Sequence, residues 1–138
     1  MSHLPATQIF VNLPVADLNR SVAFFTELGF TFDARFTDDS ATCMLVGENI
    51  FVMLLTRERF AAFTRKPVAD ATTVTEVLVA LALASRAAVD DLVRRALDAG
   101  GSVYADPQDQ GWMYQHSFAD TDGHQWELMY ADISKFGT

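Results

Sequence analysis

Apolar and polar residues alternate along the first half of the chain as they do in a strand followed by a helix. QIFVNLPV (8–15) predicts a strand, and apolar residues recur at helical spacing in DLNRSVAFFTELGF (17–30). Asp17 lies where an N-cap residue accepts hydrogen bonds from the first free amides of a helix, and Gly29 ends it. Three more strands are predicted after turn-forming residues, in TFDARF, ATCMLV and NIFVMLL (31–36, 41–46 and 49–55).

The second half repeats this order. TTVTEVLVALAL (72–83) is rich in β-branched residues and predicts a strand, Ser85 caps a helix, and Gly100 and Gly101 end it. Further strands are predicted in SVYAD, WMYQHSF and HQWELMYAD, and the turn ADTDG suits a hairpin between the last two. The pattern therefore predicts an α+β protein of one domain, residues 1–138, with modules at 7–56 and 73–133 and a connector at 57–72.

The connector is the one segment without apolar alternation, and it gathers basic residues in an otherwise acidic chain. Arg57, Arg59, Arg65 and Lys66 all lie within it. Two interpretations are open: a solvated connection between the modules, or a mobile flap that meets an anionic ligand.

Composition and charge narrow the classes of function. Half of the residues are hydrophobic and 12% are aromatic, which indicates a globular protein with a substantial core. The formal net charge of −8 argues against binding nucleic acid, and no run reaches the roughly 18 apolar residues that span a bilayer. A single cysteine, Cys43, lies in a predicted strand and is expected to be an inert core thiol. These features favour a cytoplasmic protein without a membrane partner.

Three segments together carry a family resemblance: VADLNRSVAFFTELGF, AVDDLVRRALDAGG and FADTDGHQWEL. Their order and spacing resemble the vicinal oxygen chelate superfamily, which includes glyoxalases, bleomycin resistance proteins and extradiol dioxygenases; the glyoxalase-like members are the nearest in pattern. The resemblance covers essentially the whole chain. It implies paired βαβββ modules that curl into a mixed sheet around a cavity, frequent homodimers, and, in the enzymes, a divalent metal held by four side chains.

This sequence departs from the family at the metal ligands. Carried over residue by residue, the first position falls on Phe10, the second on Leu54, and the third on Leu78 or Val79. Only the fourth keeps a ligand, as Glu127. Because one carboxylate does not hold such an ion, we expect no cofactor. A shifted ligand set for Ni, Zn, Mn or Fe is the alternative.

The final hairpin offers candidate chemistry. Strand alternation places Glu127 on the face that the family turns toward its cavity. If the hairpin turns symmetrically about Thr121 and Asp122, His116 lies opposite Glu127. The two side chains are then either a general acid and base or a structural pair.

Two functions from different classes remain. The first is a metal-free protein that binds a small, partly aromatic molecule, with Glu127 and His116 fixing its orientation. The second is a lyase or isomerase resembling lactoylglutathione lyase, with Glu127 abstracting a proton next to a carbonyl. The expected ligand-binding residues are Phe10, Asn12, Leu54, Leu78, Trp112, Tyr114 and Phe118.

Overall fold

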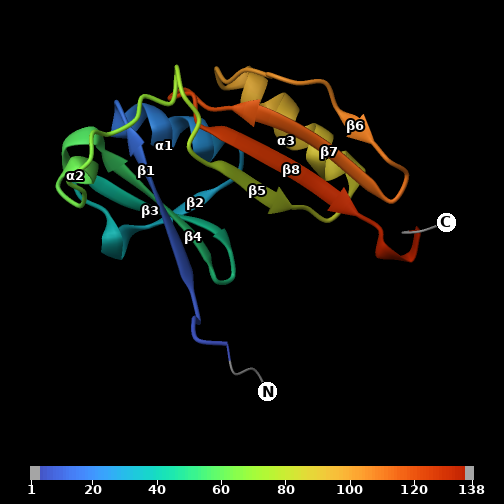
Figure 1. Ribbon diagram of the computed structural model, residues 1–138, viewed down its shortest axis with the longest axis horizontal. Coiled ribbons are helices and arrows are strands. Elements are labelled where there is room, and N and C mark those ends of the chain that lie inside the picture. The colour runs from blue at the N-terminus through green and yellow to red at the C-terminus, as the bar shows by residue number, and fades with distance from the viewer. Residues whose placement is uncertain (1–3, 136–138) are drawn as a thin grey trace. The chain divides into compact units, whose positions relative to one another are not determined.

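The computed structural model describes residues 4–135, and its elements follow a similar order in the two halves of the chain (Figure 1). The chain divides into two compact units, one ending at Val68 and the other beginning at Ala69. No helix within residues 4–135 is long and apolar enough to cross a membrane.

The first unit contains a four-stranded mixed sheet in the order β1-β4-β3-β2, in which β1 is parallel to β4 and the other pairs are antiparallel. Its elements are β1 (Ile9–Val15), α1 (Leu18–Glu27), β2 (Thr31–Asp33), the 3-10 helix η1 (Ala34–Phe36), β3 (Ala41–Gly47), β4 (Ile50–Thr56) and α2 (Arg57–Ala61).

The second unit repeats the arrangement with the sheet order β5-β8-β7-β6, and again only the first pair is parallel. Its elements are β5 (Leu78–Ala82), α3 (Arg86–Asp98), β6 (Gln108–Asp109), β7 (Met113–Ala119), β8 (Gln125–Ala131) and the 3-10 helix η2 (Ile133–Lys135). Both units therefore have the predicted βαβββ order.

The helix ends follow the predicted capping. Asp17 accepts a hydrogen bond from the backbone N–H of Arg20 at 3.1 Å, and the Ser85 hydroxyl accepts one from the N–H of Ala88 at 3.0 Å. Gly29 and Gly100 follow the two helices with φ angles of 100° and 107°, a conformation that favours glycine. Local sequence alone thus sets where both long helices begin and end.

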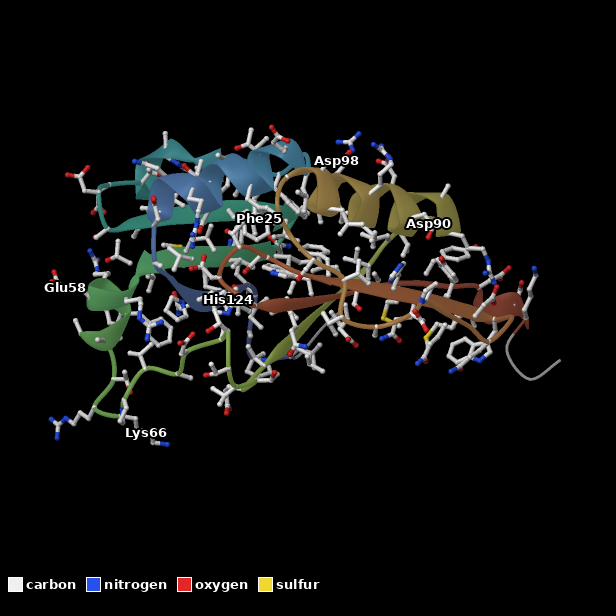
Figure 2. The ribbon with its side chains drawn as sticks, turned by 90° about the horizontal axis from the view of Figure 1, so that it is seen from above. Phe25, Glu58, Lys66, Asp90, Asp98 and His124 are labelled. Carbon is white, nitrogen blue, oxygen red and sulfur yellow. The ribbon has the colours of Figure 1, made fainter. Side chains whose placement is uncertain are left out.

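In the second unit, one face of the sheet packs against α3 (Figure 2). The helix buries Val89, Val93 and Ala96. On the sheet side, Trp126 and Leu128 are fully buried, and alternation along β8 places them together on this face. We call this side of the sheet the helix face, and the opposite side, which carries Glu127, the open face.

In the first unit, alternation again separates two faces. Val52, Leu54 and Met44 are at most 1% exposed and share the face that packs against the apolar side of α1, which buries Phe24 and Phe25. The other face is its open face. Cys43 is buried as expected, and burial together with the negative charge of Asp33 raises the pKa of its thiol, which keeps it in the unreactive form.

Three predicted strands differ from the structure. TFDARF is a strand only to Asp33, because the Asp33 side chain accepts a hydrogen bond from the N–H of Arg35 and caps η1. In the second half, the strand is confined to Leu78–Ala82. SVYAD contributes only one isolated bridge, between Ser102 and Ala119, and the strand β6 forms later, at Gln108–Asp109.

The connector is held locally at both ends. Arg59 lies over the ring of Phe63 and donates a hydrogen bond to the Ser40 hydroxyl at 2.9 Å. Farther along, Ala71 lies against Gly123 in the turn between β7 and β8, where a Cβ atom would come within 2.6 Å of the Ala71 carbonyl oxygen. Both open interpretations of its basic residues stay predictions.

Candidate functional site

The register of the final hairpin corrects the predicted pairing of His116 with Glu127. Glu127 lies opposite Ser117, and His116 lies opposite Leu128. The hairpin turns about Asp122 alone, with Ala119 opposite Gln125, so every partner is displaced by one residue. Because a shift of one residue exchanges the two faces of a strand, His116 lies on the helix face and Glu127 on the open face. The His116 and Glu127 couple is wrong.

In the same register, two expected ligand-binding residues lie on the face of the sheet opposite to Glu127. Phe118 is 0% exposed and its ring stacks on Trp126, with 6.2 Å between ring centroids. Tyr114 donates its hydroxyl hydrogen to Asp90 of α3 at 2.6 Å, and Arg86 lies over its ring. Both therefore belong to the helix face, where they join the sheet to α3.

Arg86 and Tyr114 form the centre of that attachment. Arg86 makes a two-pronged salt bridge with Asp109 of β6, with nitrogen–oxygen distances of 2.6 and 3.0 Å. The hydrogen bond to Asp90, burial and the nearby carboxylates raise the pKa of Tyr114 to about 12, because they disfavour the phenolate. Tyr114 therefore has a structural role in the second unit.

Glu127 on the open face is held by two neutral donors. Tyr104 donates its hydroxyl hydrogen to Oε2 at 3.0 Å, and the Gln115 side-chain amide donates to Oε1 at 2.7 Å. Glu127 and Gln115 are half-buried. These two hydrogen bonds fix the orientation of the carboxylate. Each of its oxygens can still accept a further hydrogen bond.

The surroundings of Glu127 mix polar and apolar side chains. Ala80 is paired with it in β5, and Leu78, one of the expected ligand-binding residues, lies on the same face and is 52% exposed. Gln125 also lies on this face and accepts a hydrogen bond from the Thr75 hydroxyl at 2.6 Å. An apolar surface with a few directed polar groups is typical of sites for small molecules.

Tyr104 was missed by the sequence analysis. It lies between α3 and β6, in a segment without regular pairing beyond Ser102, and alternation gave no sign that it reaches β8. Burial raises the pKa of its phenol, the hydrogen bond to Glu127 and the charge of that carboxylate raise it further, and a hydrogen bond with Ser117 acts in the opposite direction.

The first unit places the other expected residues. Phe10 is 48% exposed on its open face and stacks on Phe51, with centroids 4.8 Å apart, and Asn12 is exposed on the same face. Leu54 is 0% exposed on the face packed against α1, so its expected place in a ligand site is wrong. Its neighbour Met53 is paired with Asn12 and lies on the open face.

Internal repetition identifies Met53 as the counterpart of Glu127. Asn12 lies five residues before the N-cap Asp17, and Ala80 lies five residues before the N-cap Ser85. Asn12 is paired with Met53, as Ala80 is with Glu127. The alignment that placed the second family position on Leu54 is therefore displaced by one residue.

Trp112, the last expected ligand-binding residue, lies in the connection between β6 and β7. It is half-buried, and its carbonyl oxygen accepts a hydrogen bond from the N–H of Asp132 at 2.6 Å. This connection lies at the opposite end of the β7–β8 hairpin from the turn at Asp122.

The residues at the family's metal positions do not fit the usual ion. Phe10 and Leu78 offer no lone pair, and Met53 offers only a thioether, which suits soft metals rather than Ni, Zn, Mn or Fe. Within residues 4–135, no group of three or more His, Cys, Asp or Glu side chains is placed to hold a metal ion.

Comparisons with known proteins agree with the observed fold. Residues 7–47 match a family model described as bleomycin resistance protein-like N-terminal. A hypothetical protein, SA1046 from S. aureus, is 26% identical over 94% of this chain and 96% of its own, with a TM-score of 0.77. No curated protein sequence gives a significant match.

Two further solved structures share the fold. A glyoxalase/bleomycin resistance protein/dioxygenase from Nocardioides is 24% identical, covering 94% of this chain and 86% of its own, with a TM-score of 0.70. The bleomycin resistance determinant encoded on transposon Tn5 is 20% identical over 92% and 99%, with a TM-score of 0.65. The first unit therefore matches a bleomycin resistance protein-like family model, and nearly the whole chain shares the fold of the glyoxalase/bleomycin resistance/dioxygenase proteins.

Proposed function

We propose that this protein binds a small organic molecule on the open face of its second sheet, with Glu127 as the polar anchor and without the superfamily's usual metal. The observation that carries the proposal is the carboxylate of Glu127, oriented by Tyr104 and Gln115. Solved structures of the same fold include the Tn5 bleomycin resistance determinant and a fosfomycin resistance protein from Listeria monocytogenes. Both names refer to small molecules, which supports a ligand of that size.

The side chains around the Glu127 carboxylate indicate the chemical class of the ligand. Leu78 and Ala80 supply apolar, exposed surface beside Glu127, whose unused lone pairs accept hydrogen bonds. The ligand is therefore a molecule with an apolar body and an N–H or O–H donor.

Binding is tested by nuclear magnetic resonance with 2-naphthalenemethanol as the probe. We expect shifts concentrated at Leu78, Gln115 and Glu127, because these residues share the open face. Residues of the helix face, such as Phe118, serve as the reference. Shifts confined to that reference set, or none at millimolar probe, would contradict the proposal.

The absence of a functional metal is tested by elemental analysis of the purified protein after dialysis. Retention of Ni, Zn, Mn or Fe at one ion per chain would overturn the metal-free site. The expected result is substoichiometric metal, because Phe10, Met53 and Leu78 provide none of the ligands that these ions require.

A lyase or isomerase activity at Glu127 is the alternative function of the same site. Tyr104 and Gln115 orient the Glu127 carboxylate as a proton-abstracting base also requires. In D2O, 2-hydroxyacetophenone would then exchange the protons next to its carbonyl, and Glu127→Gln would abolish this exchange. For a binding protein, the exchange rate equals that without protein, and Glu127→Gln changes affinity by no more than about tenfold.

The homodimer also stays a prediction. Light scattering at micromolar protein concentration tests it, and a purely monomeric species would remove it.

A further inference from the structure

Tyr104 reaches across the open face from outside the sheet. Its hydroxyl lies 3.0 Å from Oε2 of Glu127 and also bonds the Ser117 side chain. Its own side chain is 38% exposed, whereas Ser117, which lies opposite Glu127 in the hairpin, is only 3% exposed. Tyr104 thus holds Oε2 of Glu127 from outside the sheet.

Among residues 4–135, no charged side chain neutralises Glu127. Both side chains that donate to it, a phenol and an amide, are uncharged. No salt bridge within residues 4–135 includes Glu127, although others form there. A cationic ligand would therefore meet an uncompensated carboxylate in a chain whose net charge is −8.

We propose that Tyr104 is a positioning residue that fixes the Glu127 carboxylate, and that the site consequently selects ligands carrying a positively charged nitrogen over anions. This inference rests on the proposed function, since it concerns the same carboxylate. A carboxylate that is already held in one orientation loses little side-chain entropy when a ligand binds. More of the free energy of the charge-assisted hydrogen bond therefore contributes to affinity. An anion is repelled by the same group.

The experiment uses two matched probes and five proteins. The probes are 2-naphthylmethylamine, which is an ammonium at neutral pH, and 2-naphthoate, which carries the same ring system and a negative charge. Calorimetry compares the wild type with Tyr104→Phe, Glu127→Gln and the double variant. Tyr130→Phe is the control, because it makes the same chemical change in β8 on the face opposite to Glu127.

We expect the wild type to bind the ammonium at least tenfold more tightly than the naphthoate. Tyr104→Phe should weaken ammonium binding about threefold to fivefold, and Glu127→Gln up to about tenfold. The double variant should bind within about twofold of Glu127→Gln alone, because Tyr104 acts only through that carboxylate. Tyr130→Phe should bind as the wild type does.

Additive losses in the double variant would show that Tyr104 contacts the ligand independently, and would overturn its positioning role. Wild-type affinity in Tyr104→Phe, beside a loss in Glu127→Gln, would overturn this inference alone and leave the proposed function standing. Wild-type affinity in Glu127→Gln would overturn the anchor and, with it, the proposed function.

A second measurement does not need a ligand. Titration of labelled tyrosine rings by nuclear magnetic resonance follows Tyr104 directly, and Tyr114 in the same spectra is a reference. In Glu127→Gln the pKa of Tyr104 should fall, because the carboxylate that raises it is gone, whereas that of Tyr114 should not move. An unchanged Tyr104 titration would show that the two side chains do not interact in solution, and would overturn the inference.

Discussion

The indole N–H of Trp126 donates a hydrogen bond to Oδ2 of Asp120, and the two atoms lie 3.0 Å apart in the buried interior of the second unit. The other oxygen of Asp120 accepts hydrogen bonds from the backbone N–H groups of Asp122 and His124, at 2.9 and 3.0 Å. One carboxylate therefore joins the β7–β8 turn to the core residue on which Phe118 stacks.

Asp120→Ala should lower the free energy of unfolding by about 2 to 4 kcal/mol, because it leaves buried donors without an acceptor. Urea denaturation followed by tryptophan fluorescence measures this change. Asp39→Ala is the control, since Asp39 is exposed, and it should stay within about 0.5 kcal/mol of the wild type. Equal effects of the two variants would contradict the role of Asp120.

Tyr114 predicts a loss of stability at high pH. Its pKa is about 12 in the folded chain and 10.0 ordinarily, so its contribution is complete below pH 10 and is lost as the pH rises through about 12. Urea midpoints between pH 8 and 12 should therefore fall less steeply in Tyr114→Phe than in the wild type. Equal slopes in wild type and Tyr114→Phe would rule the effect out.

Gly123 and Gly111 are a matched pair for separating backbone strain from steric conflict. Both have positive φ angles, 88° and 84°, but a Cβ atom would meet the Ala71 carbonyl at Gly123 and nothing within 4 Å at Gly111. Gly111→Ala should destabilise by about 1 to 2 kcal/mol, and Gly123→Ala by about 2 to 4 kcal/mol. Similar losses in the free energy of unfolding of both variants, measured by urea denaturation, would mean that Ala71 of the connector does not pack closely against Gly123.

Phe118 and Phe10 should respond very differently to truncation. Phe118→Ala removes a fully buried ring and should reduce the free energy of unfolding by about 3 to 5 kcal/mol. Phe10→Ala removes a half-exposed ring that stacks on Phe51, with an expected loss of about 1 kcal/mol. A small loss at Phe118, together with weaker probe binding, would restore it as a ligand residue.

The parts of the fold that local chemistry determines were predictable. Asp17, Ser85, Gly29 and Gly100 are recognisable because capping and positive φ angles depend on the residue itself. The lengths of the strands were harder to predict. β5 begins only at Leu78, because its pairing with β8 sets its limits, and its β-branched composition does not.

The candidate site depended on longer-range geometry. Glu127 was placed on the correct face because alternation within one strand is local. Its partners were not found, since the register of β7 depends on a turn centred on Asp122, and Tyr104 approaches from a segment without periodic pattern. The shift from Leu54 to Met53 has the same origin, since it follows from pairing with Asn12.

Every ladder of strand pairing closes within its own unit, and the boundary between the units lies at Val68 and Ala69. A cut between Lys66 and Pro67 would therefore interrupt no sheet. A loop inserted there should leave both sets of strands intact, so strand pairing places no obstacle to an insertion at this position.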